Sequence, residues 1–123
     1  MILTDTCVLI EYLKKNAEVT TEINAAGTEN IMLNTIIVME LLAGARNKVE
    51  LNSIKKRLND FKILDINQSI MDKASSLMET FYLSHGLKIP DAVIAATAIY
   101  YNIPLFTFNK KDFRYIPKIK LFK

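Results

Sequence analysis

The sequence holds very few residues of the kinds that staple, kink or break a chain. Its 123 residues include one cysteine, one histidine, three glycines, three prolines and no tryptophan. The single cysteine, Cys7, excludes an internal disulfide, and one Cys with one His cannot supply the ligands of a zinc site. Half of the residues are hydrophobic. This composition excludes a disordered tail and predicts one compact domain over residues 1–123.

Long apolar runs are also missing. The longest, Ala92 to Tyr101, is interrupted by Thr97 and is well short of the roughly 20 residues that a membrane span needs. The N-terminus reads Met-Ile-Leu-Thr-Asp and lacks the basic start and apolar stretch of a signal peptide. Together with the lone cysteine, these absences predict a cytoplasmic protein with no membrane partner.

Several catalytic motifs are absent as well. There is no Gly-x-Ser-x-Gly elbow for a Ser-His-Asp hydrolase and no glycine-rich phosphate loop. The only histidine, His85, stands in a Ser-His-Gly sequence at a helix terminus, and we predict that it is a solvated loop residue. Cys7 is predicted to pack in the interior.

Charge is in modest positive excess, with 16 basic and 13 acidic residues giving a net charge of +3. The excess is uneven, because from residue 104 onward the only acid is Asp112. The basic residues of this segment are Lys110, Lys111, Arg114, Lys118, Lys120 and Lys123. A second basic group occupies residues 46–62. Such patches suit a polyanionic partner, and they equally fit an ordinary solvated surface.

Predicted strands and helices alternate along the chain. Short apolar runs predict strands at residues 2–4, 30–33, 62–64, 104–108 and 119–122. Apolar residues at helical spacing predict helices at residues 7–15, 19–26, 36–45, 49–58, 69–84 and 91–101, the third of them capped by Thr35. This alternation predicts a single α/β domain, with a central, mostly parallel sheet flanked by helices on both faces.

Three acidic residues occupy positions that stability alone does not explain, and a further acid is a candidate fourth member of the group. Asp5 ends the first strand, Glu40 interrupts the apolar run 36–43, Asp91 opens the apolar run 91–96, and Asp112 follows the strand predicted at 104–108. Each has a plain explanation. Asp5 would cap a helix, and Asp91 would be a first-turn acid stabilised by the helix dipole. Glu40 would face solvent, and Asp112 would pair with a neighbouring Lys or Arg side chain.

Taken together, the four acids indicate a metal site. The carboxyl ends of parallel strands meet at one edge of a sheet, where ligand crevices form. Carboxylates gathered there repel one another unless a cation lies among them, and hard divalent cations such as Mg²⁺ or Mn²⁺ prefer such oxygen ligands. A carboxylate cage with basic flanks suits phosphodiester chemistry.

Four segments, in this order, resemble the motifs of the PIN-domain family, in the form carried by VapC-type toxin ribonucleases of VapBC toxin–antitoxin systems. The first is Leu-Thr-Asp-Thr-Cys-Val-Leu at residues 3–9, and the second is Met-Glu-Leu-Leu-Ala-Gly at 39–44. The third is Pro-Asp-Ala-Val-Ile-Ala-Ala-Thr-Ala at 90–98, and the fourth is Leu-Phe-Thr-Phe-Asn-Lys-Lys-Asp-Phe at 105–113. They span nearly the whole chain.

The resemblance implies a PIN-like fold and a Mg²⁺-dependent endoribonuclease, with Mn²⁺ as a substitute, that leaves 5′-phosphate and 3′-hydroxyl ends. Its catalytic residues would be Asp5, Glu40, Asp91 and Asp112, and the first three would bind the metal. Thr6 and Thr107 would hydrogen-bond these ligands or the metal's water. Many PIN domains have an Asp where this chain has Asn109, so either Asn109 or Asp112 completes the site.

The resemblance also implies partners. The RNA backbone would be held by Lys110, Lys111 and Arg114. Tyr100, Tyr101 and Phe113 are candidates for stacking on bases, although packing in the core or at a dimer interface is the favoured interpretation. A VapB-like antitoxin would lie across the acidic groove. The apolar segments 36–43 and 92–101 leave surplus hydrophobic surface for a homodimer.

Two other functions stay open. One is a phosphatase or receiver-like domain that uses Asp5 as its phospho-acceptor. A dehalogenase-type phosphatase would have a second Asp two residues later, where this chain has Cys7. The other is a binding module for RNA or protein that keeps the fold without catalysis. The four acids argue against this second alternative.

Overall fold

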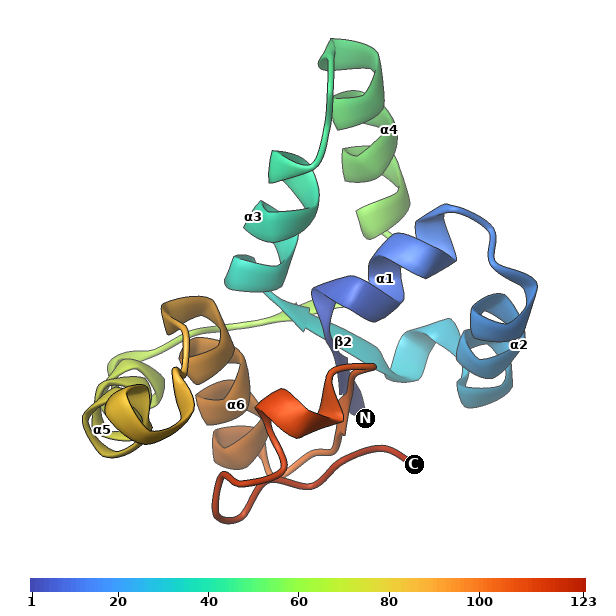
Figure 1. Ribbon diagram of the computed structural model, residues 1–123. Coiled ribbons are helices and arrows are strands. Elements are labelled where there is room, and N and C mark those ends of the chain that lie inside the picture. Colours follow the sequence, from blue (N-terminus) through green and yellow to red (C-terminus); the bar gives the residue numbers. More distant parts are fainter.

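The computed structural model describes residues 1–123 and shows strands and helices in alternation (Figure 1). The strands are β1 (Ile2–Thr4), β2 (Ile31–Asn34), β3 (Lys62–Leu64) and β4 (Leu105–Phe106). The helices are α1 (Thr6–Leu13), α2 (Ala17–Ala26), α3 (Thr35–Ala43), α4 (Lys48–Leu58), α5 (Gln68–His85) and α6 (Ile89–Tyr101). Two 3₁₀ turns are η1 (Thr28–Asn30) and η2 (Lys110–Asp112). The predicted α/β class is confirmed.

The four strands form one parallel sheet in the order β3-β2-β1-β4. Leu3 pairs with Met32 of β2 on one side and with Leu105 of β4 on the other. Crossovers between parallel strands are right-handed. The connections from β1 to β2 and from β2 to β3 run in one direction across the sheet, and the connection from β3 to β4 runs in the other. The helices of the last connection therefore lie on the opposite face from those of the first two. Figure 1 accordingly shows α5 and α6 on one side of the sheet and α1 and α2 on the other.

This strand order creates a crevice at a defined place. Strand β1 has β2 on one side and β4 on the other. The connection that follows β1 and the segment that follows β4 therefore leave the sheet in different directions, and they separate at the carboxyl ends of these two strands. In open α/β sheets, ligands bind at such a divergence. Asp5 follows β1 and Thr107 follows β4, so both predicted site residues lie at this point.

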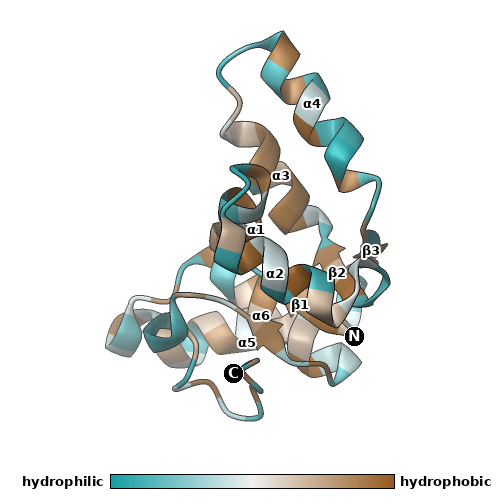
Figure 2. Ribbon diagram, turned by 90° about the vertical axis from the view of Figure 1, so that its right-hand side faces the viewer, coloured by the Kyte–Doolittle hydropathy of each residue, from teal (hydrophilic) through white to brown (hydrophobic).

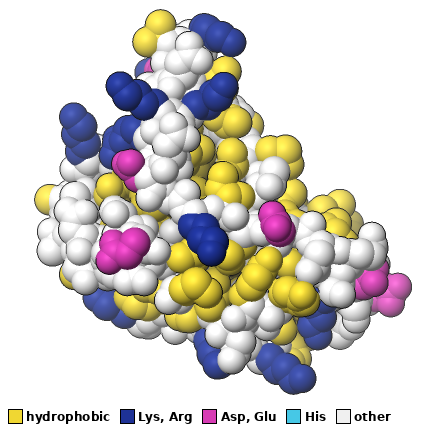
Figure 3. Space-filling view, turned by 180° about the vertical axis from the view of Figure 1, so that it is seen from behind, with side chains coloured by type: hydrophobic (Ala, Val, Ile, Leu, Met, Phe, Trp, Pro, Cys, Tyr) yellow, Lys and Arg dark blue, Asp and Glu magenta, His cyan; other side chains and the backbone are white.

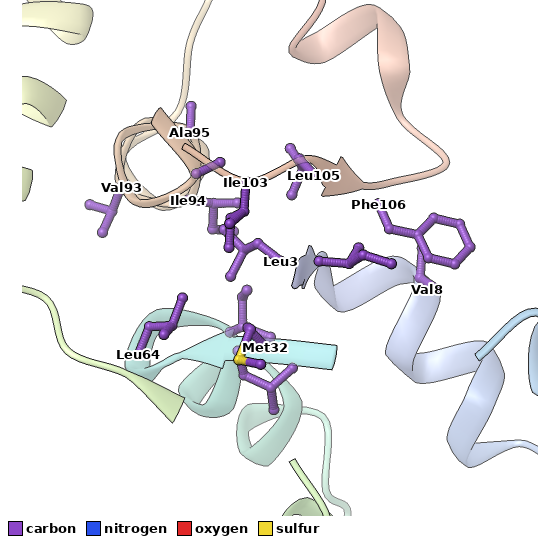
Figure 4. Packing of buried hydrophobic residues seen from close by; sticks show 14 of the residues in the cluster. Leu3, Val8, Met32, Leu64, Val93, Ile94, Ala95, Ile103, Leu105 and Phe106 are labelled. Atoms are coloured by element: carbon purple, nitrogen blue, oxygen red, sulfur yellow. The ribbon is translucent and has the colours of Figure 1, made fainter. Parts of the chain in front are cut away.

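The core surrounds the central strand. Leu3 is fully buried, and Figure 4 shows Ile94 of α6 and Ile103 close above it. Every residue of α6 from Ala92 to Ala98 is buried. The prediction that residues 92–101 leave surplus hydrophobic surface for a homodimer is therefore wrong for most of this helix, because α6 is packed inside the domain.

Asparagine side chains begin four of the helices. Asn16, Asn34, Asn47 and Asn67 each accept a hydrogen bond from a backbone N–H in the first turn of α2, α3, α4 and α5. The predicted cap of the third helix, Thr35, is wrong by one residue. Asn34 caps α3 through Ile37 N at 2.9 Å, and its amide also donates to Thr97 Oγ1 at 3.0 Å inside the core.

The C-terminal strands are shorter than predicted. The strand expected at residues 104–108 contains only Leu105 and Phe106, because the chain turns at Thr107, whose Oγ1 accepts a hydrogen bond from Asn109 N. The edge strand expected at 119–122 is a single bridge between Leu105 and Leu121. The remaining helices and strands lie within about three residues of their predicted bounds.

The surface includes a projecting, polar helix. Helix α4 carries Lys48, Lys55, Lys56 and Arg57. Figure 2 colours much of α4 hydrophilic and α3 hydrophobic, and Figure 3 shows Lys and Arg side chains around the projecting α4. Arg57 is partly structural, since it donates to the Leu13 carbonyl and lies over the Tyr12 ring. No helix is long and apolar enough to cross a membrane.

Candidate active site

Asp5 is held firmly at the end of β1. It is the N-cap of α1, as its plain structural explanation requires, and its Oδ1 accepts a hydrogen bond from Thr6 N at 2.8 Å. Its Oδ2 accepts from Thr107 Oγ1 at 2.8 Å and from the Cys7 thiol at 3.5 Å. Asp5 is only 5% exposed. Both carboxylate oxygens therefore have donors that fix the orientation of the group.

Glu40 of α3 is joined to the same place by Thr6. The Thr6 hydroxyl donates to Glu40 Oε1 at 2.8 Å across the contact between α1 and α3. Glu40 is half-buried, so the prediction that it simply faces solvent does not describe it. Thr6 thus bonds to Asp5 through its backbone and to Glu40 through its side chain.

Asp91 lies in the first turn of α6, just after Pro90, and is half-buried. Burial raises its pKa to about 6, and the charges of Asp5, Glu40 and Asp112 add to the effect, while Lys88 opposes it. No hydrogen bond to its carboxylate offsets this penalty. The structure therefore brings together all four carboxylates that the sequence singled out.

The fourth side of the site is formed by η2 and the turn before it. The backbone N–H of Asn109 donates to Thr107 Oγ1 at 3.0 Å, so Asn109 supports the hydroxyl that holds Asp5. Asp112 is exposed and takes no part in either ion pair of the protein, which join Arg46 to Glu50 and Lys123 to Glu22. The predicted ion pair between Asp112 and a nearby Lys or Arg side chain is therefore wrong.

The carboxylates share one pocket of about 310 Å³. Its lining consists of Asp5, Thr6, Cys7, Ile10, Glu40, Lys88, Pro90, Asp91, Asn109 and Asp112. The predicted RNA-binding residues Lys110, Lys111 and Arg114 are exposed but lie outside this lining, and the Lys110 ammonium contacts the Lys123 carbonyl.

Sequence reasoning missed two residues of this pocket. Lys88 is its only cationic side chain, and the signal for it was its place three residues before Asp91. Cys7 is half-buried, as packing predicts, but its thiol points at the Asp5 carboxylate. Burial raises the pKa of the Cys7 thiol, which keeps it protonated and able to donate to Asp5.

The donor set suits a hard divalent cation. Four carboxylates face one pocket with one lysine among them, and burial and mutual repulsion already raise the pKa of Asp91. No three of these groups are close enough to form a ready-made metal cage. The chemistry of these side chains fits a divalent cation.

Comparison with known proteins agrees with this geometry. The PIN domain family model matches residues 2–119. Ribonuclease VapC1 of Methanocaldococcus jannaschii is 33% identical over 98% of this chain and 84% of its own length. A chain of a toxin–antitoxin complex from Klebsiella pneumoniae is 30% identical, with a TM-score of 0.81 over 97% of this chain and 95% of its own.

A second structural relative gives a similar match. A chain of VapBC2 from Rickettsia felis, solved with a DNA fragment from the promoter of the pair, is 26% identical, with a TM-score of 0.83 over 99% of this chain and 98% of its own. The family model, the Methanocaldococcus relative and the two solved structures all cover almost the full chain. This chain therefore belongs to the PIN-domain family and, within it, to the VapC-type proteins.

Proposed function

We propose that this protein is the toxin of a type II toxin–antitoxin pair and a metal-dependent endoribonuclease. The observation that carries the proposal is the gathering of Asp5, Glu40, Asp91 and Asp112 around one pocket at the divergence of the strands. The Methanocaldococcus relative is a ribonuclease by name, and the Klebsiella relative comes from a toxin–antitoxin complex.

Asp5, Asp91 and Glu40 would hold Mg²⁺, for which Mn²⁺ would substitute. When bound, the cation would offset the negative charge of the phosphate and make water a stronger nucleophile. Thr107 and Thr6 N–H fix Asp5, and the Thr6 hydroxyl fixes Glu40, so two of the three ligands are oriented before anything binds.

The reaction is hydrolysis of a phosphodiester bond by water attacking phosphorus in line with the leaving oxygen. Asp112 is our candidate for taking the proton of the attacking water, because it lines the pocket without an ion-pair partner. The bond to the 3′-oxygen breaks, which leaves a 3′-hydroxyl and a 5′-phosphate. Lys88 would contact a phosphate oxygen in the pocket, and Lys110, Lys111 and Arg114 would contact the RNA backbone beyond it.

A test of this proposal uses purified protein, freed from any bound antitoxin, with total RNA in Mg²⁺, in Mn²⁺ and in EDTA. An Asp5→Asn variant keeps the shape of the side chain but loses its charge. We expect cleavage that requires the cation and disappears in Asp5→Asn, and sequencing of the ends should give 5′-phosphates. Cleavage that persists in EDTA and in the variant would contradict the mechanism, and no cleavage would favour a binding module.

The antitoxin would bind where apolar and acidic surfaces meet. A groove of about 400 Å³ between α1, α3 and α4 is lined by Ile10, Leu13, Leu41 and Ile54, and it shares Ile10 and Glu40 with the acidic pocket. We propose that an antitoxin segment places apolar side chains in this groove and a basic side chain among the carboxylates. Replacing Ile54 by Asp should abolish inhibition by the antitoxin while RNA cleavage continues.

A further inference from the structure

His85 and Tyr115 form a stacked aromatic pair. His85 ends α5 and Tyr115 follows η2, and their ring centroids lie 3.9 Å apart with an interplanar angle of 13°. Ser84 Oγ and His85 Nδ1 are joined by a hydrogen bond of 2.7 Å, which fixes the imidazole. His85 is exposed at a helix terminus, as predicted, but it belongs to the last turn of α5 and stacks on Tyr115, so it is not a free loop residue.

No third aromatic ring stacks on the outer face of His85. Phe81 packs edge-on against both rings, 5.6 Å from the His85 centroid and 5.1 Å from that of Tyr115. Because Phe81 is almost equally distant from the two rings, it lies beside the stack and not on top of it. The face of His85 that points away from Tyr115 is left uncovered by any aromatic ring, and His85 is the more exposed member of the pair.

The pair borders the acidic pocket directly. His85 and Tyr115 line a small polar pocket of about 100 Å³ together with Gly86, Leu87, Lys88, Asp91 and Asp112. Three of these residues, Lys88, Asp91 and Asp112, also line the acidic pocket. The aromatic pair therefore lies next to the place where the scissile phosphate would bind.

This combination matches what single-stranded RNA requires. Unpaired bases stack on aromatic or histidine rings, and phosphates contact lysine. Neither Phe113 nor Tyr101, two of the stacking candidates suggested by the sequence, fits as well. Phe113 is 1% exposed, and the Tyr101 hydroxyl is engaged with the Asp65 carbonyl.

We propose that the His85–Tyr115 pair is the platform on which the base next to the cleaved phosphodiester stacks. This inference rests on the proposed ribonuclease function and adds a base-binding subsite beside the cut. Lys88 lines both the small polar pocket and the acidic pocket, and it would contact the phosphate that joins the stacked nucleotide to the cut.

The test combines changes in protein and substrate. A short single-stranded oligonucleotide spanning a mapped cut is prepared with all bases, and with an abasic sugar on either side of the cut. We expect His85→Ala to lower kcat/KM by about tenfold on the intact oligonucleotide, the usual worth of one stacked base. An abasic sugar at one of the two positions should cause a similar loss in the wild type and little further loss in His85→Ala.

Two further variants separate stacking from folding. His85→Phe keeps a flat ring and should retain most of the activity. If His85 acted only through its hydrogen bond to Ser84, His85→Phe would lose as much activity as His85→Ala, because both variants lack that bond. Tyr82→Ala is the matched control, since Tyr82 is a 57% exposed aromatic residue of the same helix that lines neither the small polar pocket nor the acidic pocket.

The outcomes distinguish the two proposals. Cleavage by the wild type with unchanged activity in His85→Ala would overturn the platform and leave the ribonuclease intact. The platform would also be overturned if, for each of the two abasic oligonucleotides, the loss in His85→Ala equalled the product of the loss from His85→Ala alone and the loss from the abasic sugar alone. The side chain and the base would then act independently. No cleavage by the wild type would overturn the ribonuclease and the platform with it.

Discussion

The two sides of the acidic pocket differ in how their carboxylates are held. On the side of β1 and α3, Asp5 and Glu40 accept hydrogen bonds from Thr6, Thr107 and Cys7. On the side of α6 and η2, the carboxylates of Asp91 and Asp112 accept none from the protein, and burial and like charges raise the pKa of Asp91 to about 6.

This difference separates what the fold provides from what a ligand must provide. The first side is pre-organised by the protein, and so a cation or substrate meets groups already oriented there. The second side carries uncompensated charge, which a cation would stabilise. Changes on the first side should therefore mainly affect the geometry of the site, whereas changes on the second should alter its charge and, with it, catalysis, stability and pH dependence.

The largest effect is expected at Asp112. If it takes the proton of the attacking water, Asp112→Asn should lower kcat by about 100-fold or more, since general base catalysis contributes at least that much. Asn109→Ala is the comparison, because it removes only the side chain. The backbone N–H at this position still donates to Thr107 Oγ1. Single-turnover cleavage rates would measure both. A greater loss in Asn109→Ala would indicate that Asn109 completes the site by orienting the attacking water and that Asp112 is not the base.

Thr107 tests the pre-organised side. Thr107→Val keeps the shape but removes the hydroxyl that holds Asp5 Oδ2, and loss of such an outer contact typically costs about 10- to 100-fold in activity or metal affinity. Thr4→Val is the matched control: Thr4 is equally buried, pairs with Phe106 in the sheet, and its hydroxyl has no hydrogen-bond partner. Thr4→Val should leave cleavage unchanged. Equal losses in the two variants would contradict the role of Thr107.

Much of this architecture was predictable from the sequence. The apolar runs and their spacing placed every helix and the first three strands, because burial in a parallel sheet imposes strong local patterns. The strands after residue 103 were misjudged, since β4 contains two residues and the bridge at Leu121 one pair. An apolar segment of that length can pack as an irregular chain, and the sequence does not record where its hydrogen bonds end.

The residues of the site were likewise predictable only in part. Acids in apolar surroundings pointed to Asp5, Glu40 and Asp91, because an unpaired charge there is costly and needs a reason. The contacts of His85 and Lys88 were not predictable, since His85 ends α5, Lys88 lies in the connection to α6, and both meet the pocket only through the fold. Exposed polar residues carry no periodic pattern that would indicate which way they face.

A bound cation should stabilise the protein by offsetting the repulsion among the carboxylates of the acidic pocket. At a free Mg²⁺ concentration ten times the dissociation constant, the free energy of unfolding should rise by about 1.4 kcal/mol. Thermal unfolding in Mg²⁺ and in EDTA would measure the gain. Asp60→Asn, a change to an exposed acid outside the pocket, should keep it, whereas Glu40→Gln should reduce it. An equal gain in both variants would place the cation elsewhere.

The smallest effect concerns the charge of Asp91 in the absence of metal. Its pKa rises from 3.8 to about 6 in the folded protein, so between these values the folded state holds a proton that the unfolded state has lost. The free energy of unfolding should therefore fall as the pH rises through this window and stay lower above it. Asp91→Asn removes the penalty. In EDTA at pH 7.5 we expect it to add about 1 kcal/mol, a value reduced from the full shift because the half-buried group is screened by water. At pH 4 the gain should vanish. Urea unfolding at the two pH values would measure the difference, and a variant less stable than the wild type at pH 7.5 would mean that the fold already compensates the charge of Asp91.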